Sequence, residues 1–483
     1  MQPFHILLLI GGYFSLLLAI SYITNKGGSN ADFFKAGKQS PWYLVAFGMI
    51  GASLSGVTFI SVPGAVEADS FNYFQVVLGY TFGYAVIGLV LLPLYYKLNL
   101  TSIYNYLSTR LGVASYKTGA SFFILSRTLG ATARLYLVVR ILQDAILQSF
   151  HVPFWATTLI ILLMILLYTY EGGVKTIVWT DTLQTSCMLL GLVICVFYIL
   201  NQLHLGFFDS LTAMADKGYT KVFFTEPSSK LFFVKQILAG AFVTITMTGM
   251  DQEMMQKNIS VKTLKDSQKN VITLGITMLV VISLFLFLGG LLYLFANTNG
   301  LPFTGDKLFP SVALGHMPPA MSIIFIIALI SALFPSADGA ITALTSTFCI
   351  DIIGMQRRND WDEAKKKKIR QRIHIGFAFV FLLFVMVYKW IDNPSMIGVI
   401  LKVAAYTYGP LLGLFTFGIV LKRNVIDKWV PLVCILSPLL CLLIDTNQKA
   451  LFGSFEIGLE LLIINGLITF IGLLLISKKE TAI

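Results

Sequence analysis

The chain has 483 residues, of which 56% are apolar and only 12% are charged, and its mean hydropathy is +0.79. A water-soluble protein is about 25% charged, and a larger core does not explain the loss of half of its ionic residues. The composition therefore excludes a soluble enzyme and a soluble nucleic-acid binder, and it indicates a polytopic membrane protein. The net charge of +11 is typical of membrane proteins that keep basic residues in their cytoplasmic loops.

Thirteen stretches are apolar enough to cross a bilayer as helices, which takes roughly 20 residues each. None shows the alternation of a β-barrel strand, and the first lacks the basic start and cleavage site of a signal peptide. The predicted fold is therefore all-α with about 13 transmembrane helices. The stretches are 4–23, 41–65, 72–96, 119–148, 153–171, 176–200, 232–255, 271–296, 319–350, 374–391, 396–421, 429–445 and 454–477.

Basic residues predict the orientation of these helices. The loops after the odd-numbered stretches hold 24 Lys or Arg, four of them after the seventh stretch, and the other loops and their flanks hold 8. Because basic loops stay in the cytoplasm, we expect the N-terminus outside and the C-terminus inside. The lysine run 365–368 is interpreted as a cytoplasmic loop at the anionic leaflet, not as a nucleic-acid site. The five cysteines lie in apolar runs and indicate neither a disulfide framework nor a zinc site.

Two of the stretches are poor continuous helices. Residues 48–64 combine glycines, hydroxyl-bearing residues and Pro63, and residues 240–252 combine glycines and threonines with Asp251 and Gln252. An unwound span exposes carbonyls that can coordinate a cation, although small residues also suit a close contact between helices. The second interruption comes five stretches after the first, which predicts an inverted repeat with a binding site between its halves.

The predicted organisation is one transmembrane transporter domain, 1–483, with inverted repeats at about 41–200 and 232–421. The additional helices would then be 4–23, 429–445 and 454–477. No loop is long enough for a soluble domain, so the function is expected to reside within the membrane.

Acidic and hydroxyl side chains mark two further stretches. In the ninth, Pro335, Ser336 and Asp338 lie in an apolar run, and carboxylate and hydroxyl oxygens suit a small hard cation. Asp338 is also compatible with a proton site or with an exposed helix end. In the sixth, Asp181 lies near the start, where helix capping is an alternative to an ion-related role. A short cytoplasmic turn at 170–175 is expected before it.

In order along the chain, these segments resemble the sodium/solute symporter family, which includes sodium-coupled glucose, proline, pantothenate, iodide and sialic acid transporters. The resemblance covers nearly the whole chain. It rests on 32–38, on Leu92-Pro93-Leu94-Tyr95-Tyr96 with Thr101, Tyr104, Tyr106 and Arg110, on Gly172-Gly173 with Trp179-Thr180-Asp181, on Asp251-Gln252 with Gln256, and on the region from Ser336 to Asp351.

The resemblance implies a leucine-transporter-like fold with a five-plus-five inverted repeat, one extra N-terminal helix and two extra C-terminal helices. It also implies a sodium site between the first interrupted span and the ninth. Its ligands would be the carbonyl oxygens of Gly51, Leu54 and Ala332 and the hydroxyl of Ser336. Relatives usually supply a second hydroxyl where this chain has Pro335.

Some members of the family bind a second sodium ion. They use an aspartate that matches Asp181 and hydroxyls that match Pro335, Asp338 and Gly339. In this chain only Asp181 and Asp338 carry side-chain oxygens at those positions. Both are therefore expected to ligate a second cation or to exchange a proton.

The solute site is expected at the bilayer midplane, between the two interrupted spans. Ser53, Ser55 and Thr58 on the first span and Asp251 and Gln252 on the second suit a hydrogen-bonding solute.

Arg127 and Arg134 lie seven residues apart in the fourth stretch and share a helix face. An arginine fork matches a carboxylate, so an anionic sugar such as sialic acid is one expected solute. An internal pair with Asp181 or Asp251, and a neutral sugar or polyol as solute, are the alternatives.

The resulting hypothesis is a sodium-coupled secondary symporter, not an enzyme, that imports a small organic solute by alternating access. Its partners would be the solute, Na+ and the lipid bilayer, with no nucleic acid, in a bacterial inner membrane. Proton coupling is the main alternative, and an ion channel, a membrane-embedded enzyme and a solute sensor are rivals of other classes. No HExxH motif or Ser/Lys dyad favours the enzyme, and no signalling domain favours the sensor.

Overall fold

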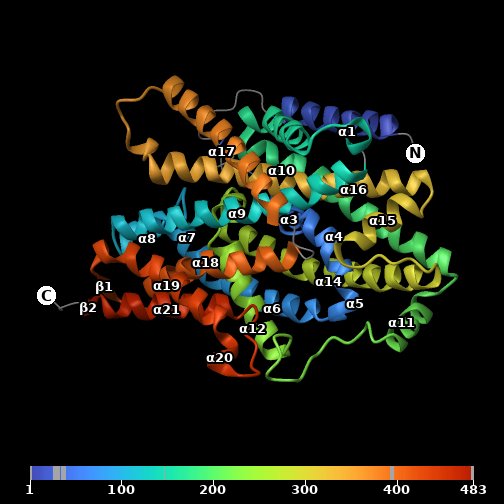
Figure 1. The fold of residues 1–483 in the computed structure, drawn as a ribbon. Coiled ribbons are helices and arrows are strands. Elements are labelled where there is room, and N and C mark those ends of the chain that lie inside the picture. Colours follow the sequence, from blue (N-terminus) through green and yellow to red (C-terminus); the bar gives the residue numbers. More distant parts are fainter. Residues whose placement is uncertain (1–2, 25–32, 34–39, 146, 392–395, 480–483) are drawn as a thin grey trace.

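The computed structural model describes residues 3–24, 33, 40–145, 147–391 and 396–479 (Figure 1). Apart from Phe33, the loop 32–38 that carries part of the family resemblance lies outside the described residues. The regular secondary structure of the described residues is helical apart from one short antiparallel ribbon, in which β1 (Arg423–Val425) pairs with β2 (Ser477–Lys479). The helices are α1 (Pro3–Thr24), α3 (Trp42–Ser53), α4 (Gly56–Gly64), α5 (Val66–Asp69), α6 (Tyr73–Val86), α7 (Leu92–Lys97), α8 (Asn105–Arg110), α9 (Val113–Ala145), α10 (Phe154–Leu203), α11 (Phe207–Asp216), α12 (Phe233–Thr244), α13 (Gln252–Ile259), α14 (Leu264–Thr298), α15 (Leu308–Gly315), α16 (Pro319–Thr347), α17 (Glu363–Ile391), α18 (Met396–Val420), α19 (Val430–Thr446), α20 (Gln448–Phe452) and α21 (Leu461–Leu475).

The predicted spans correspond to helices of the structure. Nine described helices are long and apolar enough to cross a membrane, and two bent helix pairs raise this number to eleven. Two shorter apolar helices, Phe154–Tyr170 and Leu461–Leu475, fall on the two remaining predicted stretches. The all-α membrane fold is therefore confirmed, with nine to eleven candidate spans and two shorter apolar helices at the other two predicted stretches.

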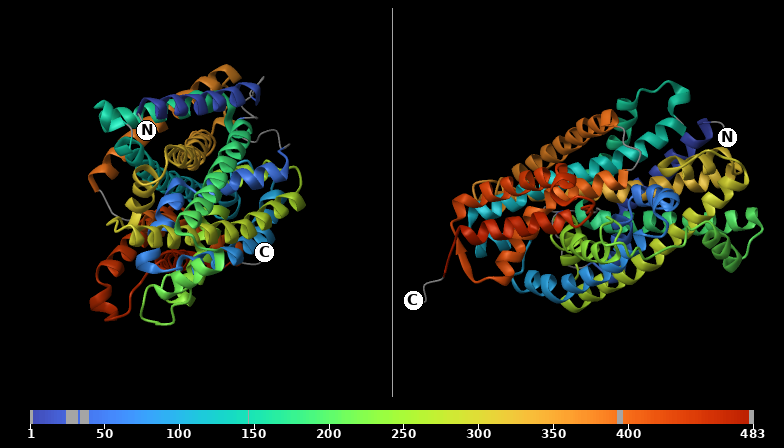
Figure 2. Two further views of the ribbon diagram at one scale, coloured as in Figure 1. Left: turned by 90° about the vertical axis from the view of Figure 1, so that its right-hand side faces the viewer. Right: turned by 60° about the horizontal axis from the view of Figure 1, so that its bottom comes forward.

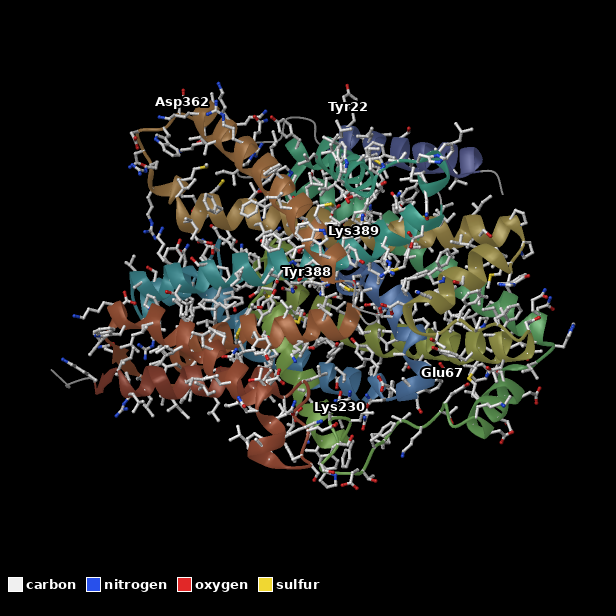
Figure 3. All side chains as sticks on the ribbon, in the orientation of Figure 1. Tyr22, Glu67, Lys230, Asp362, Tyr388 and Lys389 are labelled. Carbon is white, nitrogen blue, oxygen red and sulfur yellow. The ribbon has the colours of Figure 1, made fainter. Side chains whose placement is uncertain are left out.

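The outside of the bundle is apolar. Large side chains such as Leu89, Phe197 and Trp390 are well exposed, although they belong to long helices. Figure 3 shows Tyr22 projecting outward from α1 in the same way, and polar Asp362 on the loop before α17. A soluble monomer rarely exposes so much contiguous apolar surface, so these faces are the lipid-facing surface of a multi-pass membrane protein.

Helix α10 differs from expectation. Its backbone is helical from Phe154 to Leu203, through the turn predicted at 170–175. At 1.5 Å per residue it would measure about 75 Å if straight, more than twice the hydrocarbon thickness. It therefore contains two of the predicted spans, Phe154–Tyr170 and Thr176–Leu203.

Both interrupted spans are bent helix pairs in the structure. Helices α3 and α4 meet at 54°, and the helix that begins with α12 and runs through the π-helical turn Ile245–Gly249 meets α13 at 65°. The contacts between helices are equivalent in the two halves. Helix α6 packs on α12 as α14 packs on α4, and α9 packs on α18 as α16 packs on α10. This exchange of partners is what an inverted repeat produces. Figures 1 and 2 show α3 and α4 enclosed by the other helices, with α11 at the periphery.

Glycines bring the backbones of these helix pairs together. A Cβ atom added to Gly240 of α12 would lie 2.9 Å from the carbonyl carbon of Val76 in α6. In the other half, a Cβ added to Gly289 of α14 would lie 2.6 Å from the carbonyl oxygen of Pro63 in α4. Small residues at such crossings are common between membrane helices, because they allow close van der Waals packing. The crossings hold the two bent pairs in place around the site.

Candidate functional site

The break between α3 and α4 provides free carbonyl groups. Leu54, with φ −89° and ψ 87°, leaves the helical conformation, and its amide is the last to bond back into α3. Among the described residues, the carbonyls of 51–54 accept no backbone hydrogen bond from the next turn. The last carbonyls of a helix lack intrahelical partners, so their oxygens need a hydrogen-bond donor or a cation from elsewhere. This set includes Gly51 and Leu54, the two carbonyls expected to bind sodium.

The same break lies against the middle of α16. A Cβ on Gly56 would lie 3.9 Å from the amide nitrogen of Leu333, and one on Gly51 would lie 3.7 Å from Cγ of Pro335. Ala332 and Ser336 flank these contacts and are buried. The structure therefore brings the four expected sodium ligands, Gly51, Leu54, Ala332 and Ser336, into one region.

The hydroxyl of Ser336 has a partner for its proton within α16. Its hydroxyl donates a hydrogen bond to the carbonyl of Leu333 at 2.8 Å, in its own helix. A hydroxyl has one proton, so the lone pairs of Oγ stay available to a cation. Pro335 does not break α16, which remains helical from Pro319 to Thr347, but it removes the amide that would bond to the carbonyl of Ser331.

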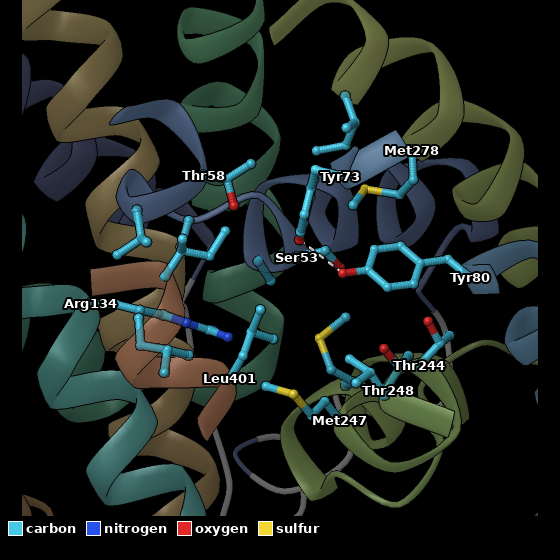
Figure 4. Close-up of a pocket in the computed structure, with 18 of the residues that line it drawn as sticks. Ser53, Thr58, Tyr73, Tyr80, Arg134, Thr244, Met247, Thr248, Met278 and Leu401 are labelled. Carbon is cyan, nitrogen blue, oxygen red and sulfur yellow. Dashed lines mark hydrogen bonds between the residues drawn. The ribbon is translucent and has the colours of Figure 1, made fainter. Parts of the chain in front are cut away.

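Next to this region lies a cavity of about 90 Å³ (Figure 4). Polar side chains reach it from four spans, and methionines, isoleucines and valines form much of the remaining wall. Tyr73 and Tyr80 are hydrogen-bonded to each other at 2.9 Å across one side of it. Its polar lining residues are Ser53, Ser55, Thr58, Tyr73, Tyr80, Tyr84, Arg127, Arg134, Thr244 and Thr248.

The three hydroxyl residues expected from the first interrupted span, Ser53, Ser55 and Thr58, all line this cavity. Ser53 Oγ is buried without a hydrogen-bond partner among the described residues. An unpaired buried hydroxyl costs free energy, and a bound solute or water would relieve that cost.

The two arginines of α9 are in different situations. Arg127 forms an ion pair with Glu253 and lies 3.9 Å from Asp251, so it has the internal partners that the alternative interpretation required. Arg134 lines the cavity, and Figure 4 shows its guanidinium directed into it. Within the described chain, Arg134 makes no ion pair. Both arginines line the cavity, but Arg127 is paired with Glu253, so the fork of Arg134 is the positive group left for a bound anion.

Asp251 and Gln252 lie outside the cavity lining. Asp251 is the N-cap of α13, where its carboxylate accepts from the amides of Glu253 and Met254 at 2.9 and 3.2 Å and from the hydroxyl of Tyr408 at 2.7 Å. Gln252 bonds to the backbone of Ile103 and of Thr101, each at 3.0 Å. The structure thus gives both residues structural partners and does not bring them to the three hydroxyls of the first span.

Asp181 and Asp338 are both fully buried, on α10 and α16. Asp181 forms an ion pair of 2.8 Å with Lys257 of α13. Asp338 accepts a hydrogen bond of 2.7 Å from the hydroxyl of Tyr168. The two carboxylates are thus near the expected ion region, but neither is without a partner.

The cavity opens to one side of the bundle. Tyr73, Ile397 and Leu401 also line a wider vestibule of about 430 Å³, which contains Lys230 and Asp445 from the loops and helix ends of that side. Toward the opposite side the route is sealed by side chain to backbone bonds. The hydroxyl of Tyr95 donates to the carbonyl of Gly249 at 2.8 Å, and that of Tyr104 to the carbonyl of Met250 at 3.0 Å. A binding cavity open to one side only is what alternating access requires.

A family model described as the sodium:solute symporter family matches residues 33–426. The chain belongs to the sodium:solute symporter family. Its function is therefore sodium-coupled secondary transport of a solute, and it is not an enzyme. The fold and the function predicted by the resemblance are confirmed.

The curated relatives of this symporter differ in solute. The sodium/sialic acid symporter SiaT of Proteus mirabilis is 23% identical over 428 residues, which are 85% of this chain and 84% of the relative. The sodium-coupled monocarboxylate transporter 1 of Mus musculus is 24% identical over 421 residues, 84% of this chain and 67% of the relative.

Among solved structures, the symporter superposes with a TM-score of 0.83 on the substrate-bound, outward-open state of a Na+-coupled sialic acid symporter. The two are 21% identical, and the match covers 98% of this chain and 99% of the other. Mhp1, a nucleobase-cation-symport-1 family transporter, matches with a TM-score of 0.58 at 13% identity, over 92% and 93% of the two chains. These similarities establish the leucine-transporter-like fold.

Several residues of this site were not predicted from the sequence. Glu253 and Lys257 form the ion pairs of Arg127 and Asp181, and Tyr73, Tyr80 and Thr248 line the cavity. The lysine was assigned to the cytoplasmic loop, although it is only 3% exposed. The signal available was the spacing of Glu253 and Lys257, four residues apart on one helix face directly after a break.

Proposed function

We propose that this symporter uses the sodium gradient to import a small organic anion that carries a carboxylate and several hydrogen-bonding groups. The observation that carries the proposal is Arg134, whose guanidinium faces the cavity while Arg127 on the same helix is occupied by Glu253. A guanidinium in low dielectric needs an anionic partner, and its planar fork binds a carboxylate through two hydrogen bonds.

The relatives support an anionic solute. Sialic acid, monocarboxylates and iodide, which appear in the names of the relatives, all carry one negative charge. A sugar acid such as sialic acid also has hydroxyl groups that match Ser53, Ser55, Thr58 and Thr248 in the cavity. We therefore propose an anionic sugar as the first solute to test and a short monocarboxylate as the second.

We infer that the coupling ion binds to the carbonyls of Gly51, Leu54 and Ala332 and to Ser336 Oγ. Sodium prefers hard oxygen ligands, and the free carbonyls of α3 provide them without another buried charge. An ion held there would bridge the break of α3 to α16, so sodium binding would stabilise the arrangement that forms the wall of the solute cavity. A ligand that stabilises one conformation raises the affinity of a second ligand for the same conformation.

The proposed location is the inner membrane of a bacterium, with the N-terminus outside. In that orientation the vestibule with Lys230 and Asp445 opens to the periplasmic side. The conformation is then outward-open, which suits the loading of sodium and solute.

The test is uptake into proteoliposomes that contain the purified symporter. Radiolabelled sialic acid, pyruvate, proline, glucose and a polyol are supplied with and without an inward sodium gradient. We expect sodium-dependent uptake of a carboxylate-bearing solute, inhibited by other acids and not by their amides. Sodium-dependent uptake of a neutral solute, with equal inhibition by neutral and acidic analogues, would contradict the proposed charge of the solute.

A further inference from the structure

Lys257 is a buried lysine in the middle of the molecule. It lies on α13, and its Nζ is 2.8 Å from Oδ2 of Asp181 on α10 and 3.5 Å from Oε1 of Glu253 on its own helix. All three side chains are at most 3% exposed. Lysines are almost never buried without a paired charge, so the ammonium is held by these two carboxylates.

The ammonium lies beside the proposed sodium site. Gly48 of α3 lies three residues before the sodium ligand Gly51. A Cβ added to Gly48 would lie 3.1 Å from Cβ of Asp181. A Cβ added to Gly51 would lie 3.4 Å from Cβ of Thr185, one turn after Asp181 on α10. Asp181 and Lys257 are therefore adjacent to the break of α3, and they also take part in the ion pairs of α13.

Glu253 fills the position where α16 would offer a second ligand. A Cβ on Gly339 would lie 2.8 Å from Cδ of Glu253, so the carboxylate occupies the space that a side chain at 339 would take. The family resemblance implies that members with a second sodium site have hydroxyls at the positions of Pro335, Asp338 and Gly339. In this chain those positions hold no hydroxyl, and the carboxylates around them already interact with Lys257 and Tyr168.

We propose that the ammonium of Lys257 is a built-in cation that occupies the place of a second sodium ion, so that one sodium ion accompanies each solute. The inference rests on the proposed sodium site at Ser336. An ammonium and a sodium ion carry the same charge and both bind carboxylate oxygens, so the ion pair satisfies Asp181 without a transported ion. A sodium ion in the same place would be repelled by Nζ and would have to displace it.

Removal of the ammonium should open the site. Asp181 Oδ1 already has no hydrogen-bond partner among the described residues, and Lys257→Gln would also release Oδ2 of Asp181 and Oε1 of Glu253, whose Oε2 stays paired with Arg127. Lys257→Gln keeps most of the side-chain volume but removes the charge. The carboxylates left behind would then attract a second sodium ion.

The experiment is equilibrium binding of radioactive sodium to the purified full chain, together with the sodium-to-solute ratio from reversal of flux in proteoliposomes. We expect one sodium ion per wild-type chain with a Hill coefficient near one, and two per Lys257→Gln chain with a Hill coefficient approaching two. Two sodium ions in the wild type would overturn the proposal, and so would a Lys257→Gln chain that still binds one.

The controls separate this inference from the proposed function. Lys269→Gln removes an exposed lysine that pairs with Asp266, and it should leave the sodium count at one. If Lys257→Gln does not fold, the double variant Lys257→Gln with Asp181→Asn removes both charges. This double variant should fold and bind one sodium ion. Two bound sodium ions would contradict the assignment. A wild-type chain that binds no sodium at all would instead contradict the sodium site of the proposed function.

Discussion

Arg127 and Arg134 lie seven residues apart on one face of α9, but only Arg127 forms an ion pair with a described carboxylate. Glu253, from the helix after the second break, neutralises Arg127 and so fixes α13 against α9. Arg134, about 10.5 Å further along the helix, is left to face the cavity. The first arginine is thus part of the internal structure, and the second is available to a solute.

Replacement of Arg134 by lysine should weaken solute binding. Arg134→Lys keeps the positive charge but loses the planar fork, so one of two charge-assisted hydrogen bonds to a carboxylate is lost. We expect the half-saturation concentration for solute to rise about 10- to 100-fold, which corresponds to about 1.4 to 3 kcal/mol. Initial rates of uptake over a range of solute concentrations measure this change.

Arg127→Lys is the matched control for this prediction, because its charge is directed to Glu253 and Asp251. We expect it to reduce thermal stability more than solute affinity. An Arg134→Lys symporter with unchanged solute affinity would show that the guanidinium does not bind the solute.

The loss of the Ser336 hydroxyl should weaken sodium binding. Ser336→Ala removes one of the four proposed oxygen ligands and leaves the carbonyls of α3 in place. The sodium concentration for half-maximal uptake should rise about tenfold, while the maximal rate at saturating sodium changes little. Ser322→Ala in the same helix, whose hydroxyl bonds to the carbonyl of Ala313, should leave the sodium response unchanged. Equal responses of the two variants would remove Ser336 from the site.

We expect the seal on the side opposite the vestibule to depend on Asp351. Its carboxylate accepts hydrogen bonds from the hydroxyls of Ser102 at 2.7 Å and Tyr116 at 2.8 Å, which join the loop before α8 and the start of α9 to the end of the ninth span. Asp351→Asn weakens two charge-assisted bonds, so the closed arrangement should lose about 1 to 3 kcal/mol.

Cysteine accessibility in the Asp351→Asn protein measures this shift. A cysteine placed on α8 should react faster with a membrane-impermeant maleimide added to inside-out vesicles. Asp360→Asn, in the exposed loop before α17, is the control. The same reaction rate in the Asp351 variant and in the wild type would show that this network does not hold the seal.

A methyl group at Gly240 should separate α6 from α12. The added Cβ of Gly240→Ala would lie 3.1 Å from Cα of Val76 and closer still to its carbonyl group, so the two backbones must move apart. We expect a loss of about 1 to 3 kcal/mol in stability, seen as a lower melting temperature of the detergent-solubilised protein. Gly376→Ala in α17, where the added Cβ has no atom within 4 Å, should have no such effect.

The sequence was sufficient to predict the spans and both breaks, because these features depend on local properties of the chain. Length and hydropathy locate a membrane helix, and the glycines around Ser53 and Gly249 predict where a span unwinds. The family resemblance, not these local properties, supplied the expected sodium ligands at the break and on one face of α16, and their binding of sodium stays a prediction.

Pairing between helices was not predictable in the same way. Asp251 was expected in the cavity, but it precedes a helix and caps it, which the preference of aspartate for the N-cap position would have indicated. Lys257 was assigned to a loop because the apolar stretch ends before it, whereas the bent helix continues to Ile259 and buries the charge against Asp181. The Lys257–Asp181 pair leaves no trace in a hydropathy profile, because its two partners come from distant segments.

The most direct test of sodium-coupled symport compares ion gradients in proteoliposomes that contain the wild-type protein. One set has an inward sodium gradient at equal pH, and the other has an inward proton gradient with potassium in place of sodium. We expect accumulation of the solute above its external concentration in the first set only, abolished by a sodium ionophore. Accumulation driven by the proton gradient alone would contradict sodium coupling and would favour a proton-coupled symporter of the same fold.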